Sequence, residues 1–208
     1  MDELITRLVK AYGYNEPILT DDILAAWGEF SRARVFQLLK DALKKNRLVK
    51  YAFGVYYAPT VTFFGTQSAL SFRKIIEKKY IRDGDGVFGY YSGMTFKNSL
   101  GLTMQMPNTP EVVSSKASAK FRMITIGNRS VIVRRARMQV TKNNAASLQL
   151  LELFNDGGGL FDKEKLGNIQ EFVRQKGLTP KGVLTFANVF PAKAIQNLVS
   201  VGVENVFA

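Results

Sequence analysis

The side chains best suited to chemistry in this sequence lie between Ser31 and Tyr51, where seven lysines and arginines accompany one aspartate. An arginine such as Arg34 can pair bidentately with guanine, and a glutamine such as Gln37 with adenine. Lysines on the same surface would bind phosphates. At about 100° per residue, one helical face would carry Ala33, Gln37, Lys40 and Lys44, with Arg34 and Asp41 beside it. The segment therefore predicts an interface with double-stranded DNA.

An apolar stripe must hold this face in place. Ser31 is expected to cap the helix, because its hydroxyl can accept a hydrogen bond from an orphan backbone N–H. Two strand-like runs follow at residues 48–51 and 55–58, joined by three residues that include Gly54. The expected buried stripe has the spacing of one side of a helix and consists of Val35, Leu38, Leu39, Ala42 and Leu43.

A basic helix followed by a short hairpin is typical of the end of a winged helix-turn-helix. In that fold the helix enters the major groove, and the wing, here with Lys50 and Tyr51 beside its tip, touches the flanking backbone. The alternative is an amphipathic helix with a solvated lysine face next to an ordinary hairpin. The upstream sequence favours the winged fold, because it predicts a helix over residues 2–12 and a second one that is capped by Thr20 and ended by Gly28.

A second domain is expected to begin near Val61, which gives a winged helix-turn-helix over 1–60 and a larger mixed domain over 61–208. The fold class is therefore α+β with a helical C-terminus. Strands are expected at 87–91 and 111–114, and a hairpin at 120–137 that turns at Gly127-Asn128. Thr141 is expected to cap a helix. The helices expected in this domain cover 66–82, 95–102, 145–154, 160–176 and one or two more over 180–208, interrupted at Pro191.

Composition excludes several functions. The chain contains neither histidine nor cysteine, so Ser-His-Asp and Cys-His catalysis, disulfides and thiol chemistry are impossible. It has no apolar run of membrane-spanning length. Its start, MDELITRL, is acidic and does not resemble a signal peptide. These features predict a cytoplasmic protein without a membrane partner.

The positive charge is concentrated in the middle of the chain. Residues 61–142 carry fourteen basic and four acidic groups, out of a net charge of +12 for all 208 residues. This distribution favours a polyanionic partner. Arg134, Arg135 and Arg137 form a candidate basic patch for DNA, for RNA or for a protein partner, because arginine pairs bidentately with phosphate or carboxylate. The alternative is a solvated strand end.

Motifs for catalysis are weak. Gly157–Gly159 lacks the following GK[ST] of a phosphate loop, and the DGDG run at 83–86 lacks the downstream glutamate of a calcium loop. Glu77 and Lys79 have the E-x-K spacing of a nuclease without an acidic partner upstream. We therefore expect no enzyme, no cofactor and no metal.

Three stretches together resemble the AbiEi-type antitoxins, a family of bacterial regulators paired with a toxin gene. They are SRARVFQLLKDALKKNRLVKYAFGVYYAP, YYSGMTFKNSLGLTMQMPNTPEVVSSKAS and ITIGNRSVIVRRAR, within residues 20–142. The resemblance implies a repressor of its own toxin–antitoxin operon that binds operator repeats, with an oligomer on DNA left open. It also implies a second domain that counteracts a nucleotidyltransferase-like toxin, through the toxin or its nucleic-acid substrate. The resemblance places Ser31, Arg32, Arg34 and Gln37 in the recognition helix and Lys50 and Tyr51 in the wing. The helical face adds Ala33, Lys40 and Lys44 to the expected DNA-binding residues.

Two other functions stay open at this point. One is an enzyme of nucleic acid metabolism that its winged helix delivers to the substrate, for which metal-dependent turnover would be diagnostic. The other is a winged-helix adaptor that binds only protein, for which a weak salt dependence of nucleic acid binding would be diagnostic.

Overall fold

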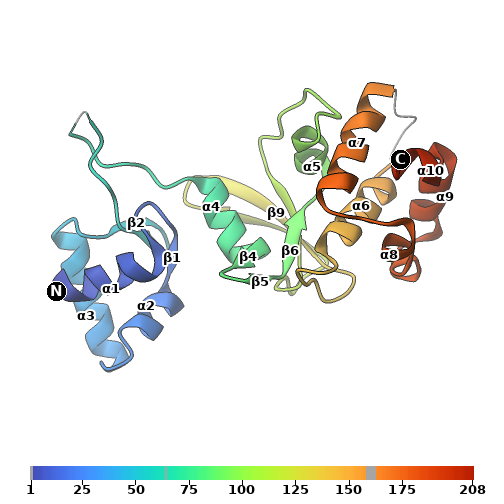
Figure 1. The fold of residues 1–208 in the computed structure, drawn as a ribbon. Coiled ribbons are helices and arrows are strands. Elements are labelled where there is room, and N and C mark those ends of the chain that lie inside the picture. The colour runs from blue at the N-terminus through green and yellow to red at the C-terminus, as the bar shows by residue number, and fades with distance from the viewer. Residues whose placement is uncertain (1, 64, 158–162) are drawn as a thin grey trace. The chain divides into compact units, whose positions relative to one another are not determined.

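A computed structural model describes residues 2–63, 65–157 and 163–208 (Figure 1). The chain is mixed α+β and forms two compact units. The first consists of residues 1–78 with 126–129, and the second of residues 79–125 with 130–208. The boundary expected near Val61 differs from this division, because the first unit continues to Lys78.

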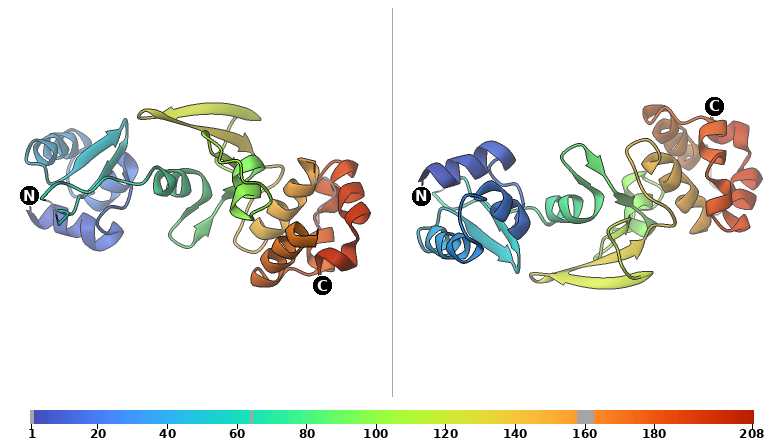
Figure 2. Two further views of the ribbon diagram at one scale, coloured as in Figure 1. Left: turned by 90° about the horizontal axis from the view of Figure 1, so that it is seen from above. Right: turned by 90° about the horizontal axis from the view of Figure 1, so that it is seen from below.

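Three helices and a small sheet make up most of the first unit, coloured from blue to cyan in both views of Figure 2. The strands form one antiparallel sheet in the order β1-β3-β2. Strand β1 was not expected from the sequence, because it contains only two residues. The elements are α1 (Asp2–Tyr12), β1 (Ile18–Leu19), α2 (Thr20–Ala26), α3 (Arg32–Lys44), β2 (Val49–Ala52) and β3 (Val55–Tyr57).

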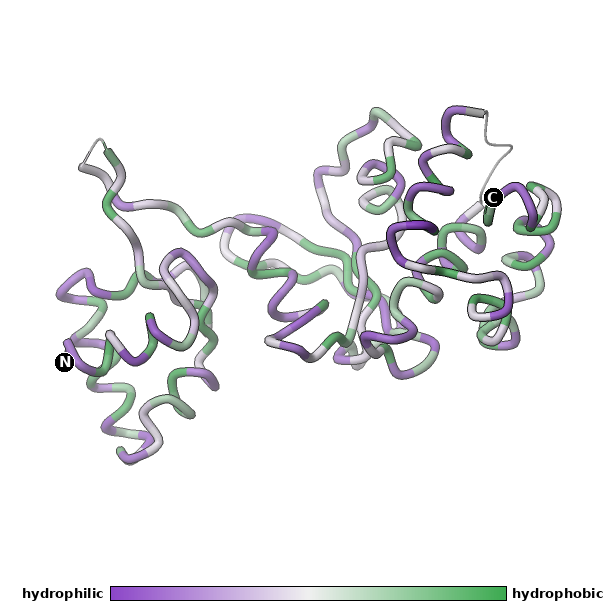
Figure 3. Tube along the Cα trace, in the orientation of Figure 1, coloured by the Kyte–Doolittle hydropathy of each residue, from purple (hydrophilic) through white to green (hydrophobic). Residues whose placement is uncertain are grey.

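The core of this unit is formed by the apolar faces of its helices. Trp27 is fully buried, and its indole N–H donates to the carbonyl of Leu4 at 3.2 Å. Hydrophobic and hydrophilic residues alternate along the helices, as Figure 3 shows. The expected stripe of α3 is confirmed at Val35, Leu38, Leu39 and Ala42, which are buried, whereas Leu43 is half-buried.

Two expectations for the first unit are wrong. Thr20 does not cap α2, because Leu19 occupies the cap position and its backbone N–H donates to Asp22 Oδ2 at 2.7 Å. The helix expected over 66–82 begins only at α4 (Phe72–Ile76) and continues as a π-helix, η1 (Glu77–Ile81). Residues 66–71 are not helical, and Ser68 Oγ accepts hydrogen bonds from the Thr60 backbone N–H at 3.0 Å and from the Thr60 hydroxyl at 3.1 Å.

The second unit contains a four-stranded sheet in the order β6-β7-β9-β8, with β7 parallel to β9. The predicted strand at 111–114 and the predicted hairpin are confirmed. The hairpin turns through Gly127, whose φ of 65° suits glycine. The elements up to this point are β4 (Arg82–Asp83), β5 (Gly86–Val87), β6 (Gly89–Tyr91), α5 (Gly93–Ser99), β7 (Glu111–Ser114), β8 (Phe121–Ile126) and β9 (Arg129–Arg135).

Helices form the C-terminal part, as expected. Helix α6 is the centre of the core, because Leu150, Leu151 and Phe154 are fully buried and α6 packs against α5, α8, α9 and β6. None of the described helices combines the length and apolar character needed to span a bilayer. The helices are α6 (Ala145–Asn155), α7 (Lys163–Gln175), α8 (Pro180–Leu184), the 3₁₀-helix η2 (Ala187–Val189), α9 (Ala192–Val201) and α10 (Val203–Val206).

Details of these helices differ from the sequence-based expectation. Thr141 does not cap α6, because Asn144 occupies the cap position and its Oδ1 accepts from the Thr141 backbone N–H at 2.7 Å. Residues 180–208 form three short α-helices and η2, and Pro191 precedes α9. The expected helix start at 160 and the glycines at 158 and 159 lie outside the described residues.

Candidate nucleic-acid interface

Helix α3 presents the predicted basic face to solvent. The side chain of Ser31 caps it as expected and accepts from the backbone N–H of Arg34 at 3.4 Å. Because the buried stripe fixes the rotation of the helix, its remaining positions point outward. The exposed predicted residues are Ser31, Arg32, Ala33, Arg34, Gln37, Lys40 and Lys44.

The two side chains expected to contact bases interact with each other. Arg34 Nη1 donates to Gln37 Oε1 at 3.3 Å on the exposed surface. Two residues before Arg34, the guanidinium of Arg32 lies 5.7 Å from the ring centroid of Phe36. These contacts hold the polar ends of the side chains near the helix surface. Contacts with bases would replace them at a modest cost in free energy, because the side-chain ends are already exposed to water.

The hairpin after α3 has an aromatic tip. Strands β2 and β3 are joined by Phe53 and Gly54, whose φ of 72° favours glycine, and the register shifts between Lys50 and Ala52. Lys50 is exposed, and its Nζ lies 6.0 Å from the Phe53 ring centroid. A cation and an aromatic ring therefore share the tip.

Tyr51 is less available than expected. It is half-buried, and its ring lies beside Gly127, where an added Cβ would come within 3.3 Å of Tyr51 Cε1. The glycine at the hairpin turn thus allows close packing against Tyr51. The phenol hydroxyl of Tyr51 is the group of this side chain that can donate a hydrogen bond to a phosphate.

Two aromatic residues of this surface were missed by sequence reasoning. Phe53 is 94% exposed at the hairpin tip, and Phe36 is 41% exposed on α3. A signal for both was present in the sequence. Phe36 lies outside the apolar stripe of its helix, and Phe53 occupies the expected connection between two strands, so neither position has a core to enter.

Arg134 has a different environment from the one expected of a basic patch. Its Nη2 donates to Ser92 Oγ at 2.8 Å, to Glu152 Oε1 at 2.9 Å and to Asp156 Oδ2 at 3.3 Å. Its Nε lies 3.0 Å from Glu111 Oε1 but makes no hydrogen bond with suitable geometry. The guanidinium is therefore occupied by an internal ion network.

Burial controls the ionisation of this network. It raises the pKa of the Glu152 carboxyl, although Arg134 acts in the opposite direction. Burial also raises the pKa of the neighbouring Tyr90 phenol, so this group stays protonated. For Arg134 itself, burial lowers the pKa, but Glu152, Asp156 and Glu111 raise it by more. A charged arginine among partly desolvated carboxylates is the result.

The three arginines consequently do not form one uniform exposed patch. Arg137 is shared between Glu152, at 3.7 Å, and the ring of Phe190, whose centroid lies 5.1 Å from the guanidinium carbon. Arg135 is exposed. Of the three, only the Arg135 side chain lacks an ionic partner within the part of the chain that the structure describes.

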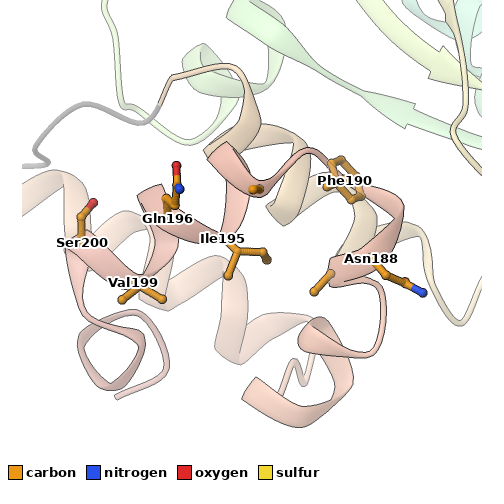
Figure 4. A pocket seen from close by; sticks show the side chains of 8 residues that line it. Asn188, Phe190, Ile195, Gln196, Val199 and Ser200 are labelled. Carbon is orange, nitrogen blue, oxygen red and sulfur yellow. The ribbon is translucent and has the colours of Figure 1, made fainter.

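Other candidate chemistry is sparse. Within the described ranges, no group of three or more acidic side chains could hold a metal ion. Glu77 pairs with Arg73 at 3.0 Å, and the Lys79 side chain lies near the ring of Tyr80. An apolar hollow of about 720 Å³ lies on the C-terminal helices, and Figure 4 shows Phe190, Ile195 and Val199 among its lining side chains. It has no charged lining residue that would select a ligand.

No family model matches the chain, and no curated protein matches it significantly.

Proposed function

We propose that residues 1–60 form a winged helix-turn-helix that binds double-stranded DNA through α3 and the β2-β3 wing. The observation that carries this proposal is the exposed face of α3. It combines Arg34 and Gln37, which suit base edges, with Lys40 and Lys44, which suit phosphates. The helix is capped at Ser31 and held by a buried apolar stripe, so its exposed side chains have fixed positions from which they could contact a DNA groove.

The wing extends the same surface. Lys50 would contact the flanking phosphates, and the exposed ring of Phe53 at the tip would add an apolar contact in the adjacent groove. On α3, Phe36 is suited to the methyl group of thymine. Arg32 and Ala33 complete the face near the helix N-terminus, where a backbone phosphate would be favoured by the helix dipole.

We further propose that the protein acts in the cytoplasm as an antitoxin that represses its own operon and counteracts a nucleotidyltransferase-like toxin. Support comes from the resemblance of residues 20–142 to AbiEi-type antitoxins and from the size of the second unit, which DNA binding by α3 does not require. Operator repeats would be filled by several copies, each on one half-site.

The test is footprinting on the region upstream of the protein's own gene, followed by affinity measurements on the protected sequence at several salt concentrations. Gln37→Ala should relax base preference by about 1–3 kcal/mol at one position. Lys44→Ala should weaken binding to all sequences and lower the salt slope by about one. Lys10→Ala, which removes an exposed charge from α1, is the matched control and should change neither.

Three results would contradict the proposal. Unchanged affinity and base preference in Gln37→Ala would remove α3 from the interface. Metal-dependent turnover of DNA or tRNA would indicate the enzyme alternative, and nucleic acid binding with little salt dependence would indicate the protein-binding adaptor.

A further inference from the structure

A pocket of about 420 Å³ lies in the second unit, where β9 ends. Arg134, Arg135 and Arg137 line it from the strand end and the residues that follow, and Lys120 lines it from the position directly before β8. Glu152 of α6 is the one acidic residue in the lining. Four cations and one anion therefore share a small cavity.

The carboxylates nearby neutralise only the inner cations. Arg134 is surrounded by Glu111, Glu152 and Asp156, and Arg137 shares Glu152. These two arginines and three carboxylates leave one negative charge in excess. Lys120 and Arg135 are exposed, and neither side chain has an ion pair with any residue that the structure describes. The four cations and three carboxylates together carry a net charge of +1, and Lys120 and Arg135 are the two cations without an ion pair among the described residues.

These two cations are fixed at neighbouring positions by the backbone. The N–H of Arg135 donates to the carbonyl of Lys120 at 3.3 Å, which holds the two strand ends together. Val113 of β7 and Ala136 supply apolar wall. Because the lining comes from a sheet and from the buried helix α6, the site exists before a ligand arrives, which lowers the entropic cost of binding.

We propose that this pocket binds the phosphate groups of a nucleotide. A phosphate monoester carries up to two negative charges, and the exposed Lys120 and Arg135 have no ion pair among the described residues and can each contact a phosphate oxygen. Arginine is suited to bidentate phosphate contacts. The volume lies within the range of ordinary ligand pockets, roughly 300–1,000 Å³, which exceeds what inorganic phosphate alone would fill. The site belongs to the second unit and does not involve α3 or the wing.

The experiment is calorimetric titration of the full-length protein with ATP and, separately, with inorganic phosphate. We expect saturable binding of ATP and weaker binding of phosphate. The double variant Lys120→Ala/Arg135→Ala should weaken ATP binding at least tenfold, because it removes two charge-assisted contacts to phosphate. Lys181→Ala/Lys193→Ala, which removes two exposed charges from the C-terminal helices, should leave it unchanged.

Absence of saturable binding at ATP concentrations up to about 100-fold above a micromolar Kd would overturn the proposal. Equal weakening of ATP binding in the two double variants would also overturn it. Binding only to RNA oligonucleotides, with no binding of ATP, would also overturn it. Gln37→Ala/Lys44→Ala separates this site from the DNA interface. That variant should bind ATP as tightly as the unmodified protein does, whether or not the unmodified protein binds DNA.

Discussion

The exposed side chains of α3 and of the β2-β3 hairpin are suited to two kinds of contact. Lysines contribute charge, and the aromatic residues contribute apolar area at defined points. Phe53 is the clearest case, because 94% of it is exposed and the nearest cation, Lys50, lies 6.0 Å from its ring centroid. An aromatic ring so exposed at a hairpin tip adds nothing to the core, so its replacement tests binding rather than folding.

Phe53→Ala should therefore weaken operator binding by a few-fold and leave the salt slope unchanged, because it removes apolar contact without removing charge. Lys50→Ala should instead lower the salt slope by about one. Fluorescence anisotropy at several salt concentrations measures both quantities. Equal affinity of Phe53→Ala and the unmodified protein would exclude the wing tip from the interface.

At the scale of elements, the Arg134 network joins β9 to α6. Glu152 is 4% exposed and depends on the Arg134 guanidinium at 2.9 Å for its charged state. Arg134→Met would leave a buried carboxylate without its main partner, which costs about 3–5 kcal/mol in comparable cases. The network thus contributes to the stability of the second unit as well as to its charge.

The loss of folding stability in Arg134→Met should depend on pH. Burial already raises the pKa of Glu152, and removal of the guanidinium that opposes this effect raises it further. A carboxyl with a raised folded-state pKa favours the folded state below its unfolded pKa, about 4.3. That advantage is lost as pH rises through the folded-state pKa. In urea unfolding, the free energy of unfolding of Arg134→Met should lie slightly below that of the unmodified protein at pH 4.5 and further below it at pH 7.5. A difference that does not change with pH would contradict this account.

The α4 segment belongs to the first unit, which changes where a stable fragment should end. Lys74 Nζ donates to the carbonyl of Asn15 at 3.2 Å and pairs with Glu16, while Lys78 pairs with Asp22 at 3.2 Å. A cut at residue 60 removes these contacts. Residues 1–78 should therefore unfold at a higher urea concentration than residues 1–60, and equal midpoints would show that α4 does not stabilise the unit.

The sequence predicted elements whose pattern is local and strong. The stripe of α3, its Ser31 cap and the turn at Gly127 follow from spacing and from residue type alone. The π-helical turn after α4 and the partners of Arg134 could not be predicted in this way. They depend on residues distant in sequence, such as Glu111 and Asp156, that the fold brings to one place. An arginine-rich strand end looks the same in sequence whether carboxylates or solvent surround it.

In the whole molecule, the two proposed activities belong to separate parts of the chain. The residues that would contact DNA lie in the first unit, and the proposed nucleotide pocket lies in the second. The variant Gln37→Ala/Lys44→Ala should therefore lose operator repression while still protecting cells that make the cognate toxin from a plasmid with an unrelated promoter. That promoter matters, because it makes toxin synthesis independent of repression.

The complementary variant, Lys120→Ala/Arg135→Ala, should keep operator repression, because its substitutions lie outside α3 and the wing. If the pocket contributes to antitoxicity, this variant should protect poorly against the same toxin. Growth of toxin-producing cells and repression of a reporter fused to the operator measure the two activities in parallel. Loss of protection in Gln37→Ala/Lys44→Ala would show that protection requires DNA binding. The two activities would then not be separable, since the toxin in this experiment is made from a promoter that the protein does not control.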